Sequence, residues 1–353
     1  MTESPHKPLV PVRINHYRLL MSSRDMIPHT GLKPEDTFMR LARAANDPRP
    51  VRTPVTIPHA HKVYQGIFSA ALVGTLAFPL LAADTRAPVH GLWVWGTLSI
   101  LKVPRSAESL RDFCHSQGIN EVYVSVSELK GKSAESQFAD LIAQLHQASI
   151  RVEALMGSSN ADEPGPPREK LLDEVREVLR FDQPPRRDGF DGIHLDIEPQ
   201  QRPENYGPQN LGFLPGLVEA YRAVRQLAAP AHLPIDADIP IKVLKGDLSQ
   251  RQLLLSALPR FTLMLYELDN PDDGQSPEKK MEKLRVASMR YLQIAYQGLN
   301  SRDLGQMSIG LRTPDYDALL PRMLQTLDDT NGANPHYLGW ARHSYNDYLR
   351  PDH

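Results

Sequence analysis

Residues 121–156 read EVYVSVSELKGKSAESQFADLIAQLHQASIRVEALM, and this stretch decides the fold. Its two ends, Glu121–Val126 and Arg151–Met156, are short apolar runs that predict buried β-strands. Between them, residues 134–148 carry apolar side chains at the spacing of one helix face, namely Phe138, Leu141, Ile142 and Leu145. The order strand, helix, strand predicts two parallel strands joined by a helical crossover.

The same unit recurs from Val89 to the C-terminus. The strands that we expect are Gly91–Trp95, Glu121–Val126, Arg151–Met156, Gly192–Ile197, Pro234–Ile239, Thr262–Leu268, Met307–Leu311 and Tyr337–Ala341. Eight such units in about 265 residues match the usual size of a TIM barrel, about 250 residues. The alternative is a doubly wound open sheet, but the sequence has no glycine-rich phosphate loop. We therefore predict an α/β protein with a (β/α)8 barrel over residues 84–353.

The segment before the barrel resembles an export signal. Residues 66–81 read GIFSAALVGTLAFPLL, a run too short for a membrane span, which needs roughly 20 residues. Small residues at 82–83 would suit cleavage, so residues 62–83 predict a signal peptide. Residues 1–61 are then a disordered leader, or they reflect a start codon set too far upstream. We expect a secreted or periplasmic protein with no stable membrane span after cleavage. The alternatives are a membrane anchor at residues 66–81 and a buried core helix.

Composition excludes several classes of function. The 353 residues carry a formal net charge of −2, which gives no broad electrostatic attraction to nucleic acid. The single cysteine, Cys114, rules out an intramolecular disulfide and a cysteine-based zinc site. The sequence leaves the oligomeric state open.

The fourth expected strand carries the polar residues of most interest. Residues 191–198 read DGIHLDIE, and alternation puts Ile193, Leu195 and Ile197 on one face of the strand. The aliphatic face suits packing under helices, so His194, Asp196 and Glu198 should point into the barrel. Pro199 ends the strand, which places Glu198 at the carboxyl end, where barrel active sites lie.

This arrangement has a chemical use. Two carboxylates held close together cannot easily both ionise, so the pKa of one of them rises. Glu198 would then stay protonated and donate a proton to a leaving group, with Asp196 orienting it. The alternative is a polar barrel plug in which His194 and Asp196 bond to each other. Alternate residues of one strand stand about 6.5 Å apart, which strains shared metal ligation. We therefore predict no metal and no organic cofactor.

The segment Asp191-Gly192-Ile193-His194-Leu195-Asp196-Ile197-Glu198 resembles the strand-four signature of glycoside hydrolase family 18, the chitinase family. That signature is Asp-Gly-apolar-Asp-apolar-Asp-any-Glu. The resemblance implies that Glu198 is the catalytic acid, Asp196 its partner and Asp191 the first aspartate. His194 stands where the family has its middle aspartate.

Two weaker matches accompany this signature. Met264-Leu265-Tyr266-Glu267 resembles the family's sixth-strand motif Met-any-Tyr-Asp, with Glu267 in place of the aspartate. This implies that Tyr266 assists a reacting acetamido group. Gly339-Trp340 falls where the family places a tryptophan beneath the sugar.

We therefore expect hydrolysis of a glycosidic bond in a glycan that carries N-acetylated amino sugars, so the expected partner is a carbohydrate substrate. Trp340 and Trp95 would stack on sugar faces, although core packing suits Trp95 equally well. Other side chains at the strand ends would contact the substrate: Asp191, His194, Asp236, Asp238, Glu267 and Arg312. Arg151 and Glu153 share a face of the third strand, where an ion pair is equally credible.

Two other functions stay open. In one, Glu267 is a carboxylate nucleophile opposite Glu198, which needs the two carboxyl groups about 5 Å apart. Alternation lets only one of Tyr266 and Glu267 point inward, and we favour Tyr266. In the other, the chain is a catalytically inactive, chitinase-like carbohydrate-binding protein.

Overall fold

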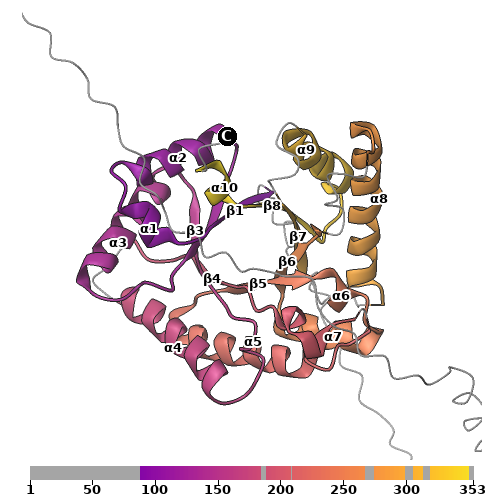
Figure 1. Cartoon of the computed structure of the whole chain (residues 1–353), viewed down its shortest axis with the longest axis horizontal. Coiled ribbons are helices and arrows are strands. Elements are labelled where there is room, and N and C mark those ends of the chain that lie inside the picture. Colours follow the sequence, from indigo (N-terminus) through magenta and orange to yellow (C-terminus); the bar gives the residue numbers. More distant parts are fainter. Residues whose placement is uncertain are drawn as a thin grey trace, which may run out of the picture. The chain divides into compact units, whose positions relative to one another are not determined.

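The structure is a computed structural model that describes residues 88–183, 188–207, 209–266, 274–298, 305–312 and 319–349. Eight parallel strands pair in sequence order, and β8 pairs with β1 to close the barrel (Figure 1). The strands are β1 Val89–Val94, β2 Glu121–Ser125, β3 Arg151–Met156, β4 Gly192–Leu195, β5 Ile235–Pro240, β6 Arg260–Met264, β7 Gln306–Arg312 and β8 Tyr337–His343. The predicted (β/α)8 barrel is confirmed. The predicted leader and signal segment lie outside the described residues.

Helices fill the connections and surround the strands (Figure 1). They are α1 Thr97–Leu101, α2 Ser106–Ser116, α3 Lys132–Gln147, α4 Pro166–Phe181, α5 Leu214–Ala228, α6 Ile241–Leu244, α7 Leu248–Ala257, α8 Pro277–Tyr296, α9 Leu320–Asn331 and α10 Tyr345–Tyr348. Local sequence explains where several of them begin. Asp247 and Gln250 form a capping box at the start of α7, and the Ser276 hydroxyl caps α8. Within the described ranges, no helix is both long and apolar enough to cross a membrane.

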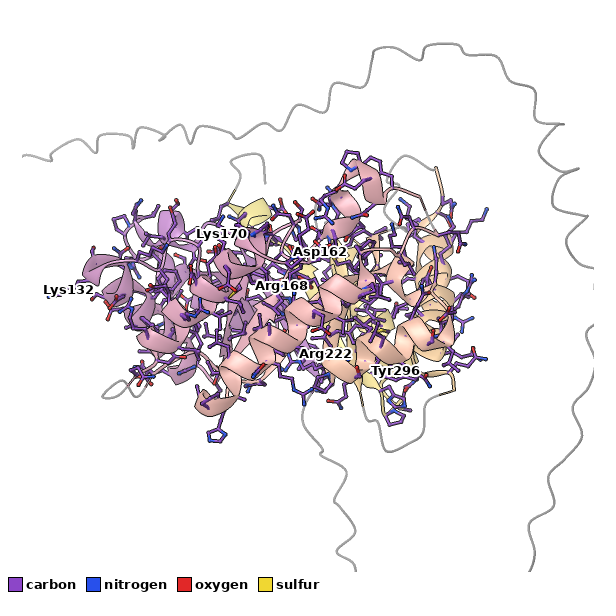
Figure 2. The ribbon with its side chains drawn as sticks, turned by 90° about the horizontal axis from the view of Figure 1, so that it is seen from below. Lys132, Asp162, Arg168, Lys170, Arg222 and Tyr296 are labelled. Carbon is purple, nitrogen blue, oxygen red and sulfur yellow. The ribbon has the colours of Figure 1, made fainter. Side chains whose placement is uncertain are left out.

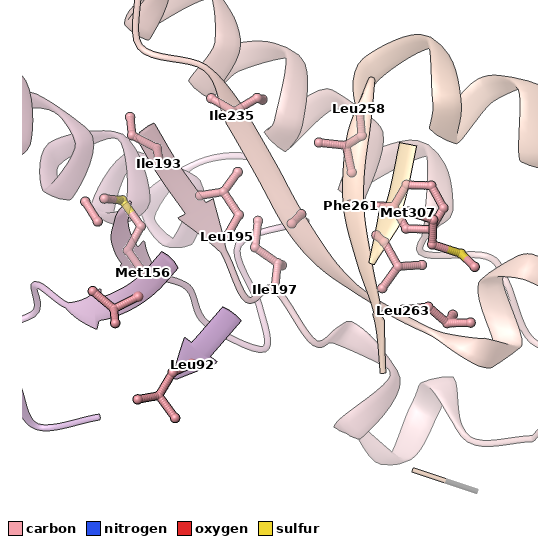
Figure 3. Packing of buried hydrophobic residues seen from close by; sticks show 14 of the residues in the cluster. Leu92, Met156, Ile193, Leu195, Ile197, Ile235, Leu258, Phe261, Leu263 and Met307 are labelled. Carbon is pink, nitrogen blue, oxygen red and sulfur yellow. The ribbon is translucent and has the colours of Figure 1, made fainter. Parts of the chain in front are cut away.

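The main hydrophobic core lies between the sheet and the helices. Ile193 and Leu195 of β4, and Ile197 after it, belong to this core and are among the packed side chains in Figure 3. All three side chains are fully buried. Burying one such aliphatic side chain stabilises the fold by roughly 1.5–3 kcal/mol. The outward faces of the strands therefore supply the stability of the barrel and leave the inward faces for polar groups.

The amino-terminal half of the barrel interior is charged. Glu121 of β2 is fully buried and contacts the guanidinium groups of Arg151 and Arg260. Arg151 also contacts Glu153 at 3.3 Å, so of the two interpretations left open for this face of β3 the structure has the ion pair. Arg260 reaches Asp236 of β5 at 3.0 Å. Burial raises the pKa of Glu121, as does Glu153, and the two arginines oppose the rise.

One strand boundary matters for this network. Strand β6 begins at Arg260, two residues before the start expected from sequence, and its strand geometry ends at Met264. The earlier start brings the Arg260 side chain into the barrel interior. It is the central cation of the network because it faces three carboxylates, those of Glu121, Glu153 and Asp236.

Candidate active site

Glu198 lies just beyond the carboxyl end of β4, where Pro199 begins a short 3-10 helix, Pro199–Gln201. The side chain is half-buried. Its two carboxyl oxygens accept hydrogen bonds from the amides of Gln200 at 2.8 Å and Gln201 at 2.6 Å. Burial raises the pKa of Glu198, Asp238 raises it further, and the two amides oppose the rise. The carboxyl group thus keeps its proton to a higher pH than an ordinary glutamate.

Asp196 lies one step deeper in the barrel. Strands β4 and β5 pair His194 with Asp236 and Leu195 with Ala237, so continuing this register by one residue sets Asp196 beside Asp238. Burial and the negative charges of Asp238 and Glu198 raise the pKa of Asp196 well above its usual range. The Asp196 backbone amide donates to the Met156 carbonyl at 2.9 Å, which holds the residue against β3.

Gly157 permits the close approach between the ends of β3 and β4. A Cβ atom at Gly157 would lie 1.9 Å from the backbone oxygen of Asp196, far inside van der Waals contact. Only glycine therefore fits at this position while Asp196 keeps its place.

His194 lies in the middle of the barrel and is fully buried. Its Nδ1 is 2.5 Å from Asp236 Oδ1, and its Nε2 is 3.0 Å from Asp238 Oδ2. The ring stacks on Tyr123, with centroids 3.8 Å apart and planes 17° apart. Burial lowers the pKa of His194, but the two aspartates more than compensate and hold it well above the usual histidine value. The imidazole is therefore charged near neutral pH.

These positions correct the expected substrate contacts of His194 and Asp236. Both are buried in the interior, where their opposite charges form an ion pair. The alternative, a polar plug in which His194 bonds to Asp196, places the ring differently, because both ring nitrogens contact aspartates of β5. Asp238 is likewise buried, and it accepts a hydrogen bond from the Trp93 indole at 2.9 Å.

Asp191 and Trp340 lie away from the Glu198 end of the barrel, which corrects their expected substrate contacts. Asp191 precedes β4 at the amino end, where it accepts from the Val152 amide at 2.7 Å and contacts His146 at 3.0 Å. Trp340 faces outward from β8 and donates to Asp328 of α9 at 3.0 Å. It also stacks on His90, with ring centroids 4.0 Å apart.

His343 takes the inward position at the carboxyl end of β8, and the sequence analysis missed it. The indole of Trp95 donates to His343 Nε2 at 3.2 Å, and Tyr266 meets the His343 ring edge-on at 6.2 Å between centroids. Burial lowers the pKa of His343, so its imidazole is neutral near pH 7. Trp95, Tyr266 and His343, from the ends of three strands, thus form one aromatic cluster. Extending the expected eighth strand by two residues beyond Ala341 would have predicted His343 on the same face as Ala341, because side chains alternate along a strand.

Two predicted site residues, Arg312 and Glu267, remain to be considered. Arg312 ends β7 and is exposed. Glu267 lies outside the described residues, so the distance from Glu198 that the nucleophile alternative requires is untested. The loops after β3 and β4 are joined by Arg202, which pairs with Asp162 at 2.8 Å and with Glu163 at 2.6 Å.

The base of the loop after β3 is also anchored. Arg168 of α4 donates to the Asp162 carbonyl at 2.5 Å and to the Gly216 carbonyl of α5 at 3.1 Å. Figure 2 shows Asp162 and Arg168 near each other on this side of the barrel. The loop that flanks Glu198 is therefore held to both α4 and α5.

One group of side chains has the spacing of a metal site. Ligand atoms of Glu153, His194 and Asp236 lie within 4.8 Å of one another. The sequence analysis considered metal ligation only along β4, whereas this group comes from three strands. Arg260 contacts Glu153 at 3.7 Å and Asp236 at 3.0 Å, and His194 is already bonded to Asp236. A guanidinium group beside both carboxylates supplies the positive charge that a bound cation would bring, so we assign these residues to the ion-pair network.

No known family model matches the sequence, and no curated protein matches it. Among solved structures, the chain is similar to a GH5_18 protein from Streptomyces cattleya in complex with GlcNAc, with TM-score 0.52 and 12% identity over 73% of this chain and 71% of that one. It is also similar to the PgaB (BpsB) glycoside hydrolase domain from Bordetella bronchiseptica, with TM-score 0.44 and 12% identity over 76% and 97% of the two chains. A chitinase from Chromobacterium violaceum ATCC 12472 gives TM-score 0.39 and 12% identity over 64% and 68%. At this identity the likeness to the GH5_18 structure shows a shared fold alone, and the activity has to be argued from this chain's own side chains.

Proposed function

We propose that this chain is a glycoside hydrolase-like enzyme that acts on a polysaccharide or glycan, with Glu198 as its general acid. The observation that carries the proposal is a half-buried carboxyl group at the carboxyl end of a barrel strand, with a raised pKa and a second carboxyl group directly behind it. A glycosidase needs such a pair because one carboxyl must hold a proton near neutral pH.

In this reaction the Glu198 carboxylic acid donates its proton to the glycosidic oxygen as the bond from that oxygen to the anomeric carbon breaks. The resemblance to family 18 implies that the acetamido oxygen of the substrate forms the new bond to the anomeric carbon. Water then opens that intermediate and gives a proton back to Glu198. Asp196 would orient the acetamido group, and Tyr266 would support it.

The aromatic cluster favours a sugar as the ligand. Trp95, Tyr266 and His343 stand together at the ends of β1, β6 and β8. Aromatic rings combine an apolar face with a polar edge, which matches the faces and hydroxyl groups of a sugar ring. Asp238 and Arg312 are less direct candidates for contacting the sugar. Asp238 is buried, and Arg312 lies at the end of β7, between β6 and β8.

One observation favours a second function, a carbohydrate-binding protein without catalysis. The amides of Gln200 and Gln201 donate to both carboxyl oxygens of Glu198. These bonds favour the carboxylate and occupy the oxygen that would carry the proton. For catalysis, at least one glutamine must move away when substrate binds.

The test is a screen of the full-length chain against oligomers of N-acetylglucosamine and of glucosamine, with new reducing ends as the readout. Glu198→Gln should lower turnover by at least 10²-fold, the usual worth of a general acid, while oligomer affinity is retained. The matched control is Glu219→Gln on the exposed side of α5, which should leave turnover unchanged. Full activity of Glu198→Gln would refute the assignment. Binding without turnover in the wild type would establish the second function.

We also propose that the protein is exported, because residues 66–81 have the composition and length of a signal-peptide core. N-terminal sequencing of the protein from the producing cell tests this. A mature terminus near Ala83 supports cleavage, and an intact residue 1 contradicts it.

A further inference from the structure

Asp238 is a buried carboxylate near Glu198 that side chains of two other strands contact. Its Oδ2 atom receives the Trp93 indole at 2.9 Å and lies 3.0 Å from His194 Nε2. The donors come from β1 and β4, on either side of the barrel interior, so the carboxyl group is held from two directions. The Asp238 side chain is 2% exposed, so water does not compete for these contacts.

Asp196 has no comparable support. Its Oδ1 atom is buried and has no hydrogen-bond partner among the described residues. The Oδ1 atom of Asp238 has none either, so the two groups differ in the contacts that Asp238 Oδ2 receives. Continued register sets Asp196 beside Asp238 on the adjacent strand, and the charge of Asp238 adds to burial in raising the pKa of Asp196. Neighbouring carboxyl groups disfavour each other's ionisation, and donors stabilise the charged form of the group that they contact. The negative charge therefore stays on Asp238 and the proton on Asp196.

We propose that Asp238 is a positioning residue of the site, a fixed anion held by Trp93 and His194 that keeps Asp196 protonated behind Glu198. This inference deepens the proposed function and rests on it only for its catalytic consequence. A protonated Asp196 presents a hydrogen-bond donor toward the substrate side, whereas an ionised one would add a second negative charge beside Glu198.

Other charged groups face this cluster and have to be considered. His194 contacts Asp236 on its other side, and Arg260 of β6 balances that second aspartate. Burial raises the pKa of the Tyr221 hydroxyl of α5, and the negative charges of Asp238 and Asp196 raise it further. Tyr221 therefore stays neutral. His343 of β8 is neutral as well. The imidazolium of His194 is thus the cation that contacts Asp238 among the described residues.

The experiment is a pH titration of the full-length chain carrying ¹³C in its aspartate carboxyl groups, followed by NMR. The Asp196 signal is assigned by its loss in Asp196→Asn. In the wild type it should remain in the acid form at neutral pH. In Asp238→Asn its midpoint should fall by about one to three pH units, the usual effect of a neighbouring like charge. The matched control, Asp140→Asn on the exposed side of α3, should leave the midpoint unchanged.

A second variant covers the case in which Asp238→Asn does not fold. Trp93→Phe removes one donor from Asp238 and keeps an aromatic ring in place. It should shift the Asp196 signal at neutral pH toward the carboxylate position. An ionised Asp196 in the wild type would overturn the proposal. So would an unchanged Asp196 midpoint in folded Asp238→Asn, or an unchanged signal in Trp93→Phe.

Activity gives an independent readout. If the chain hydrolyses a glycan, Asp238→Asn should move the alkaline limb of the kcat/KM profile to lower pH, which a purely structural role would not do. The NMR titration needs no substrate, so it can succeed while the glycosidase assay with Glu198→Gln fails. The two proposals are therefore refuted by different measurements.

Discussion

Replacing Arg260 with methionine should destabilise the barrel strongly. Its guanidinium faces the carboxyl groups of Glu121, Asp236 and Glu153, whose side chains are 0%, 2% and 3% exposed. Removing one partner of a buried ion pair costs about 3–5 kcal/mol, because a charge is left uncompensated. Three carboxyl groups lose a partner here, and Arg151 still serves two of them. We therefore expect a loss of about 4 kcal/mol in the free energy of unfolding.

The assay is urea denaturation at pH 7, supported by thermal unfolding, in which the same loss corresponds to roughly 8–16 °C in Tm. Arg222→Met is the matched control, because Arg222 pairs with Glu219 on the surface, with side chains 45% and 57% exposed. That variant should lose less than about 1 kcal/mol. Adding Glu121→Gln to Arg260→Met should recover part of the stability, since one orphaned charge disappears.

The pH dependence has a definite sign. The pKa of Glu121 is raised by burial in the wild type and rises further when Arg260 is gone. A carboxyl group with a raised folded pKa destabilises the fold above its unfolded pKa, and this cost disappears as the pH falls below that value. The deficit of Arg260→Met should therefore shrink toward acid pH. A loss no larger than that of Arg222→Met, or a deficit that grows toward acid pH, would refute the reasoning.

Three further predictions concern the site and its frame. Gly157→Ala should lower the free energy of unfolding by about 1–3 kcal/mol and displace the end of β4, because its Cβ would lie 1.9 Å from the Asp196 oxygen; thermal unfolding and the glycosidase assay measure the two effects. Asp191→Asn should lower Tm at neutral pH. Burial opposes ionisation of Asp191, but hydrogen bonds from His146 and the Val152 amide outweigh burial and lower its pKa. The stability that the Asp191 carboxylate contributes is therefore lost as the pH falls below about 4. A Tm difference between variant and wild type that persists below that pH would contradict the assignment. Tyr206→Ala should weaken binding of sugar oligomers in calorimetry and leave Tm unchanged, because Tyr206 is 57% exposed in the loop that follows Glu198; an unchanged affinity would exclude it from the sugar site.

The face to which each strand residue points could be predicted from the sequence, because successive side chains of a strand point to opposite faces. Ile193, Leu195 and Ile197 follow this rule in the core between sheet and helices, and His194 follows it in the barrel interior. Asp236 and Asp238 of β5, two residues apart, follow the same rule, since both contact His194 inside the barrel. The rule says nothing about depth, which is why His194 was expected near the substrate and lies instead in the middle of the barrel.

The charged partners of the buried side chains could not be predicted from the sequence in the same way. Arg260 and Glu121 are 139 residues apart in the sequence, on β6 and β2, and only barrel closure brings them together. The end of β8 shows the same limit. An irregular register between β7 and β8 near Met307 and Ser308, and a strand longer than expected, put His343 rather than Trp340 at the inward end.

The sequence by itself determined the class of fold, the number of strand–helix units and the inward face of β4, because each depends on local periodicity. Tertiary structure alone decided which charges neutralise each other inside the barrel, which aromatic side chains meet at its carboxyl end, and which aspartate has donors. The physical reason is that strand periodicity specifies the direction of a side chain, whereas its protonation and its partners depend on groups that chain closure brings within a few ångströms.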